Sequence, residues 1–193
     1  MKIFFFLFYF LISIPCIQSQ PIDFFREEIT FELDSIYFIV NADFYFRNTT
    51  DKVLTPMVTL PVARINYQKQ IDTILVFLQE NLVQPLPVQV KDTLARFSIE
   101  LPPGQDKLIK VIYQQRHNGH TAKYILTTTW YWKKPLEVAS YTLVCPAYVN
   151  MEKFSIPPDK ISNFNRTTLF YWNRTNYMPE TDLLLEFHLA VDP

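Results

Sequence analysis

Two of the three histidines in this chain lie on either side of an Asn-Gly pair, in the segment RHNGHTAKY at 116–124. Asn118-Gly119 is the preferred pair for a two-residue type I′ turn, because both positions must accept positive φ. A hairpin on this turn would make His117 and His120 cross-strand neighbours, close enough to share a metal ion. A durable transition-metal site normally needs a third protein ligand, and nothing local brings His188 to the turn. We therefore expect a hairpin tip, with His117 and His120 as a weak metal pair at most.

The second stretch that could do chemistry is TTTWYWKKPLE at 127–137. Exposed tryptophan and tyrosine rings beside lysines can stack on sugars or anchor a protein partner. If the stretch ends a strand, Trp130 and Trp132 share one face and pack in the core, with Tyr131 opposite. The strand interpretation is favoured, and Trp130, Tyr131 and Trp132 are kept as candidate ligand contacts for a carbohydrate-binding surface.

Other catalytic signatures are absent from the sequence. Its two glycines stand too far apart for a GxGxxG loop, a phosphate-binding loop or a GxSxG nucleophile turn. Neither HExxH nor paired cysteines occur. The acidic residues are scattered, with Glu27 and Glu28 adjacent, and two of them could still meet across a sheet as a glycosidase pair. We expect a non-enzymatic protein without a cofactor, with a hydrolase that uses an unrecognised acid pair as an alternative.

The net charge and the length of the chain limit the classes of binding partner that we expect. Lysine and arginine number 18 against 19 aspartates and glutamates, so the net charge is -1. This balance gives no electrostatic footprint for nucleic acid. The chain has 193 residues, and 16% of them are aromatic. Such a chain can bury a core of its own, and a protein or a glycan is the expected kind of partner.

The first residues, MKIFFFLFYFLISIPCIQSQ, have the parts of a secretory signal. Lys2 precedes an apolar run that is shorter than the roughly 20 residues of a membrane-spanning helix. We expect a signal peptide at 1–19, cleaved near Ser19, and a secreted or periplasmic mature protein without a membrane span. The alternatives are an uncleaved anchor and a lipoprotein acylated on Cys16, although Pro15 disfavours the latter.

Cleavage would leave Cys145 as the lone cysteine, at the end of the apolar segment YTLVCP. Its position indicates a buried structural thiol and not a nucleophile. Asn48, Asn165 and Asn173 begin glycosylation sequons, which matter only in a eukaryotic host.

After the signal the apolar residues recur with a period of two, which is typical of strands with one face on a core. Two prolines in the third segment indicate an edge or bulged strand, and 180–191 is also compatible with a helix. The segment 159–164 could form a short helical turn. The candidate strands are 29–33, 36–48, 53–62, 71–79, 94–101, 107–116, 122–132, 138–145, 167–172 and 182–191.

Many strands separated by turn signals predict an all-β protein, an antiparallel β-sandwich that is immunoglobulin-like or related. The segments DFYFRNTTDK, IELPPGQDKLIKVIYQQ and YILTTTWYWKKPLEVASYTLV resemble exported bacterial β-sandwich domains of unknown function. The resemblance implies a sandwich and an envelope or extracellular location, and it carries no activity. We expect one sandwich domain at 20–193 with a structural, assembly or ligand-recognition role, in which a strand edge or an aromatic patch makes the contact.

Overall fold

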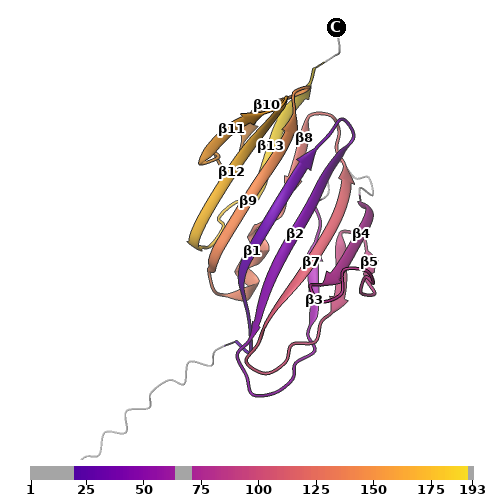
Figure 1. Ribbon diagram of the computed structural model, residues 1–193, viewed down its shortest axis with the longest axis vertical. Coiled ribbons are helices and arrows are strands. Elements are labelled where there is room, and N and C mark those ends of the chain that lie inside the picture. The colour runs from indigo at the N-terminus through magenta and orange to yellow at the C-terminus, as the bar shows by residue number, and fades with distance from the viewer. Residues whose placement is uncertain (1–19, 64–70, 191–193) are drawn as a thin grey trace, which may run out of the picture.

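The computed structural model describes residues 20–63 and 71–190, and strands dominate these ranges (Figure 1). The larger sheet of the described chain has the order β11-β12-β9-β1-β2-β7-β4. Its strands are β1 (Ile22–Leu33), β2 (Tyr37–Asn48), β4 (Ile71–Leu78), β7 (Asp106–Arg116), β9 (Leu136–Pro146), β11 (Lys160–Phe164) and β12 (Thr167–Tyr177).

A second layer covers one face of this sheet (Figure 1). Within the described ranges it consists of two short sheets, β10-β13-β8 and β3-β6-β5, and a 3₁₀ helix, η1. The elements are β3 (Met57–Pro61), β5 (Gln89–Lys91), β6 (Leu94–Ser98), β8 (Thr121–Tyr124), η1 (Thr127–Trp132), β10 (Val149–Phe154) and β13 (Leu183–Leu189). As its two prolines predict, β3 lies at a sheet edge.

The core lies between the two layers and follows the period-two pattern. In β1 and β2 the residues Ile29, Phe31, Phe38 and Val40 are buried, and the residues between them are more exposed. Phe31 stacks on Phe38 with ring centroids 5.3 Å apart. Because alternate side chains point to opposite faces of a strand, one face of the large sheet meets the second layer and the other meets solvent. The all-β sandwich predicted from the sequence is confirmed.

One pairing departs from the expected antiparallel arrangement. The two neighbouring strands β1 and β9 run parallel, with Ile29 opposite Tyr141. Parallel neighbours need a crossover connection, and here the chain leaves the large sheet after β7, passes through β8 and η1 in the second layer, and returns as β9. This crossover brings η1 over the inner face of the large sheet.

The predicted hairpin at Asn118-Gly119 is wrong. Both edges of β7 are already occupied, by β2 and by β4. Because a strand has two hydrogen-bonding edges, β8 cannot pair with β7 and pairs with β13 in the other layer. The segment 117–120 is therefore a connection between layers, and the predicted pairing of His117 with His120 does not form.

Two further segments differ from expectation. The strand expected at 122–132 ends at Tyr124, and η1 follows, because Asp182 Oδ1 accepts hydrogen bonds from the backbone N–H groups of Leu126 and Thr127 at 3.1 and 3.0 Å. The helical turn expected at 159–164 is instead β11, paired with β12. For 180–191 the strand interpretation is confirmed as β13.

Candidate functional site

A cavity of about 490 Å³ lies between the inner face of the large sheet and the second layer. Most of its wall is apolar. The described residues that line it are Phe24, Glu27, Phe44, Phe46, Met57, Val58, Thr59, Leu60, Pro61, Leu94, Tyr124, Ile125, Leu126, Thr128, Thr129, Tyr131 and Trp132. Met57 and Tyr131 are exposed to solvent, so they mark the side on which the cavity opens.

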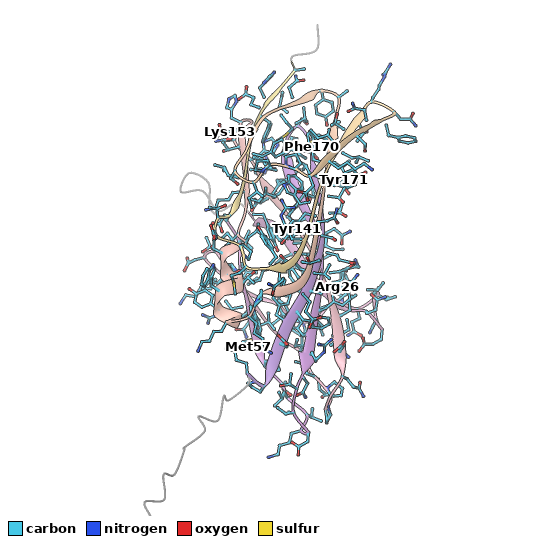
Figure 2. All side chains as sticks on the ribbon, turned by 90° about the vertical axis from the view of Figure 1, so that its left-hand side faces the viewer. Arg26, Met57, Tyr141, Lys153, Phe170 and Tyr171 are labelled. Atoms are coloured by element: carbon cyan, nitrogen blue, oxygen red, sulfur yellow. The ribbon has the colours of Figure 1, made fainter. Side chains whose placement is uncertain are left out.

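A β-bulge in β1 places Phe24 on the same face of the strand as Glu27, toward this cavity. The register of β1 against β2 shifts between Phe24 and Arg26, so Phe25 is the extra residue. A bulge re-aims the side chains on one side of it. Phe24 and Glu27 therefore point inward together, whereas Arg26 and Glu28 lie on the solvent face (Figure 2 labels Arg26).

Glu27 is buried, with 3% of its surface exposed. The hydroxyl of Tyr141, on β9, donates a short hydrogen bond to Glu27 Oε1. Burial raises the pKa of Glu27 to about 7, and the hydrogen bond from Tyr141 opposes this rise because it favours the charged form. A carboxyl group with a pKa near neutrality, facing a cavity, is a candidate functional group.

Tyrosines surround this carboxyl group. Tyr124, at the end of β8, and Tyr177, on β12, both interact electrostatically with Glu27, and burial is the main reason that their own pKa values are raised. Tyr113, on β7, is buried as well and acts on Tyr124. No lysine, arginine or histidine is among the described residues that line the cavity. The site is thus one titratable acid in an aromatic, uncharged surrounding.

Four aromatic side chains form one side of the cavity, and we call Phe24, Phe44, Phe46 and Trp132 the aromatic wall. Phe24 stacks on Phe46 with centroids 5.1 Å apart and meets Phe44 edge-on at 5.6 Å. Trp132 lies 5.7 Å from Phe24 and 5.6 Å from Phe46. Phe44 is also the cross-strand partner of Glu27. The aromatic wall and the carboxyl group are therefore adjacent.

The three aromatic candidates of the sequence fall in different environments. Trp130 and Tyr131 are 57% and 82% exposed, and Trp132 is half-buried in the aromatic wall. Trp130 Nε1 donates to the Pro179 carbonyl oxygen at 2.7 Å, which orients its ring. The expectation that Trp130 and Trp132 share a strand face fails because the segment is a 3₁₀ helix. Tyr131 and Trp132 line the cavity.

The two histidines at 117 and 120 also lie in different environments. His117 Nδ1 accepts a hydrogen bond from the N–H of Gly119 at 2.9 Å, and Nε2 lies 2.9 Å from the Asp34 carbonyl oxygen. Burial lowers the pKa of His117, so a neutral imidazole with a proton on Nε2 satisfies both contacts. His120 is exposed. No three metal-ligating side chains gather among the residues that the structure describes.

The acid pair of the hydrolase alternative needs two carboxyl groups in one pocket. Glu27 is the one carboxyl group among the described residues that line the cavity. A second hollow contains Asp23 and Glu137. There Lys134 pairs with Asp23 at 3.0 Å, and Arg47 reaches Glu137 at 3.3 Å. Both acids are thus engaged by cations, and the Glu137 side chain is exposed.

Burial bears on the predictions for Cys145 and for the glycosylation sequon at Asn48. Cys145 is a buried free thiol, and burial raises its pKa to about 12, as a structural cysteine requires. Asn48 is buried, and its Nδ2 donates to the carbonyl oxygens of Lys52 and Leu101 at 2.7 and 2.9 Å. A glycan on Asn48 is incompatible with these bonds, whereas Asn165 and Asn173 are exposed. The expected signal peptide at 1–19 lies outside the described residues.

Sequence reasoning missed Glu27 as a site residue. The adjacent pair Glu27-Glu28 is visible in the sequence, but alternation alone puts Arg26 and Glu28 on the same face as Phe24. One signal was available. From Glu27 onward the pattern Glu27, Ile29, Phe31, Leu33 continues the apolar face, which places an acid in a series of buried positions.

Neither the protein-family models nor the curated proteins contain a match to this sequence. Solved structures do share the fold. The "putative nutrient binding protein" of Legionella pneumophila superposes with a TM-score of 0.67 at 16% sequence identity, over 88% of this chain and 68% of that protein. At these identities the likeness concerns the fold.

A second similar structure is the M1 zinc metallopeptidase of Deinococcus radiodurans, with a TM-score of 0.53 at 10% identity. The match covers 86% of this chain and 42% of the metallopeptidase, so this chain corresponds to less than half of that enzyme.

The described residues contain no helix that is both long and apolar enough to cross a membrane.

Proposed function

We propose that this protein is an exported, non-enzymatic module that binds a small, largely apolar molecule in the cavity between its layers. The cavity carries the proposal, because it combines an aromatic wall with one buried carboxyl group, Glu27. Ligand pockets are typically apolar, with a few polar groups that orient the ligand. Support comes from the fold shared with the "putative nutrient binding protein" and from the signal peptide expected at 1–19.

Binding to the cavity can be tested with N-phenyl-1-naphthylamine, an uncharged fluorescent probe that brightens in apolar surroundings. The wild-type protein should bind it saturably. Leu60→Trp fills part of the cavity from β3, where Leu60 is partly buried, and should abolish the signal. The matched control is Leu184→Trp, at a half-buried leucine of β13 that is not part of the lining, and it should bind as the wild type does.

A second block guards against misfolding of the first variant. Thr128→Trp enters the cavity from η1 on another side. Far-ultraviolet circular dichroism and thermal unfolding show whether each variant is folded. Binding of the probe that survives both substitutions in folded protein would contradict the cavity as the site.

Carbohydrate binding is the second candidate function, because Trp130 and Tyr131 are exposed on η1 beside the cavity. Exposed aromatic rings stack on sugar faces. If glycans are the ligands, a glycan array should give hits that Tyr131→Ala removes, while Phe164→Ala, at an exposed ring on β11, leaves them intact.

Export has its own test. Expression of the full chain in a secreting host, followed by N-terminal sequencing of the mature protein, should show Gln20 as the first residue. A protein that retains residues 1–19 would contradict cleavage, and a lipid on Cys16 would identify the lipoprotein alternative.

A further inference from the structure

We propose that the ligand of the cavity carries a positively charged amine, which pairs with the carboxyl group of Glu27 while the apolar body of the ligand lies on the aromatic wall. This inference rests on the proposed function and specifies its ligand class. It follows from three observations on the described lining: the sign of its charge, the hydrogen-bonding capacity left on Glu27, and the rings beside it.

The charge of the cavity has one sign. Glu27 is the single acid among the described lining residues, and none of them is a lysine, arginine or histidine. The nearest cation in sequence, Arg26, lies on the opposite face of β1 and pairs there with Glu28. Since a buried charge is costly without a partner of opposite sign, a ligand carboxylate would meet an uncompensated site, whereas an ammonium group would supply the missing partner.

Glu27 also has capacity for further hydrogen bonds. A carboxylate accepts through two oxygens, and among the described residues Tyr141 is the hydrogen-bond donor that reaches it, at Oε1. The other oxygen, Oε2, is therefore available to a donor that enters the cavity. An ammonium group has several N–H donors, and hydrogen bonds between charged partners are the stronger ones.

The rings next to Glu27 favour the same ligand. Phe44 is opposite Glu27 across the β1–β2 pair, and Phe24, on the near side of the bulge, faces the same cavity. Aromatic faces attract cations and also stack on apolar groups. An arylalkyl amine satisfies both features, because its charged end reaches Glu27 and its ring lies on the aromatic wall.

Protonation provides an independent consequence. Among the described residues, Tyr141 on β9, Tyr124 on β8 and Tyr177 on β12 interact with Glu27, and burial raises the pKa of each of them, so all are neutral near pH 7. Arg174, also on β12, acts on Tyr177 and Tyr141 and pairs with Asp159. With the cavity empty, the pKa of Glu27 is raised to about 7. An ammonium ion bound beside it favours the carboxylate, so binding below pH 7 should expel the proton of Glu27 into solvent.

The test uses three probes that share a phenylbutyl body and differ in the head group: 4-phenylbutylamine, 4-phenylbutanol and 5-phenylpentanoate. Isothermal titration calorimetry of the mature protein should show the amine bound about tenfold or more tightly than the other two, as expected for a charge-assisted contact away from water. Glu27→Gln should remove this preference and keep the binding of the alcohol. Glu28→Gln, the adjacent acid on the solvent face, is the matched control and should behave as the wild type.

Proton release separates a direct role of Glu27 from a structural one. Repeating the amine titration near pH 6 in buffers of different ionisation enthalpy should show a proton released by the wild type and by Glu28→Gln, and none released by Glu27→Gln. If Glu27→Gln only loosens the cavity, it should weaken the binding of the alcohol and of the amine alike, and this result would overturn the proposal.

Different results would overturn the ligand class and the binding function. Equal binding of the three probes, or an amine preference that survives Glu27→Gln, overturns the ligand class and leaves the cavity as a binding site. Loss of all three probes and of N-phenyl-1-naphthylamine in the folded wild-type protein overturns the proposed function together with this inference.

Discussion

Glu27 and Glu28 are adjacent in the chain but lie on opposite faces of β1, one buried and one facing solvent. Glu27 faces the cavity with a tyrosine donor, Tyr141, and burial raises its pKa to about 7. Glu28 faces solvent, pairs with Arg26 and accepts a hydrogen bond from the Tyr45 hydroxyl at 3.2 Å. Each glutamate therefore accepts a hydrogen bond from one tyrosine, but within the described ranges a cation pairs with Glu28 and not with Glu27.

This difference shows how one strand builds a site and a surface from similar residues. Alternation in β1 puts Glu27 on the inner face and Glu28 on the outer one, and the bulge at Phe25 brings Phe24 onto the inner face as well. The acid without a cation is the one with functional potential, because a buried, unpaired carboxyl group can be neutralised by a proton or by a ligand. The acid with a cation lies on the solvent face.

The largest expected difference between the two faces concerns apolar burial. Replacing Phe31, which is fully buried on the inner face, by alanine should lower the free energy of unfolding by about 3–5 kcal/mol. Replacing Thr30, the next residue on the outer face, by alanine should lower the free energy of unfolding by at most about 1 kcal/mol. Urea unfolding measures both values. Comparable costs would mean that the outer face is also covered in solution.

The second prediction concerns pH. Burial raises the pKa of Glu27 in the folded protein to about 7 from its ordinary value of 4.5, so between these values the unfolded chain binds fewer protons than the folded one. Stability should therefore fall as pH rises through this window, by about 3 kcal/mol in total, and then level off. Glu27→Gln should remove this contribution.

Glu28→Gln is the control for the pH prediction and should keep the fall in stability. Unfolding by urea at several pH values between 4 and 8 gives the comparison. A wild-type curve that does not fall relative to that of Glu27→Gln would show that Glu27 is solvated in the folded state.

The third prediction compares the two tyrosine donors. Tyr141→Phe removes the hydrogen bond that lowers the pKa of Glu27, so this pKa should rise further and the fall in stability should extend to higher pH. The cost in unfolding free energy at pH 5, where Glu27 is neutral, should be about 1 kcal/mol. Carbon-13 NMR of the glutamate carboxyl groups follows the titration directly.

Tyr45→Phe makes the corresponding change for Glu28 and should leave the Glu27 titration where it is. A shift of the Glu27 pKa in Tyr45→Phe, or none in Tyr141→Phe, would contradict the assignment of the two donors to the two acids.

The smallest effect is expected on the solvent face. Glu28→Gln breaks the pair with Arg26, in which both side chains are more than a third exposed, and exposed ion pairs contribute about 0–1 kcal/mol. The loss should shrink further at high salt. A loss of several kcal/mol in urea unfolding would show that this pair is more than a surface contact.

Two turns show where sequence reasoning succeeds and fails. Asn118-Gly119 has the residues of a type I′ turn, yet β7 and β8 lie in different layers, because β2 and β4 occupy both edges of β7. A tight two-residue hairpin is found instead at Asn165-Arg166, where both residues have positive φ and the flanking strands β11 and β12 pair directly. Turn chemistry is local, whereas the occupation of a strand edge depends on residues far away in the chain.

The candidate site was partly visible beforehand. The segment that contains Tyr131 and Trp132 was selected from its residue types, although as a strand, and it forms η1 at the cavity. Glu27 is harder to select: it continues the apolar series of Ile29 and Phe31, but the bulge that also brings Phe24 onto this face is defined by the register against β2. Its partner Tyr141 comes from a strand more than a hundred residues later, through the parallel β1–β9 pair.

What the sequence determined by itself is the all-β class, most strand positions, the buried character of Cys145 and the lack of familiar catalytic motifs. These follow from residue type and a period of two, which are local properties. Only the tertiary structure decided which strands are neighbours, where the chain changes layers and which side chains surround Glu27. Those outcomes depend on edges and registers that distant segments compete for, and the site at Glu27 exists because of how that competition ends.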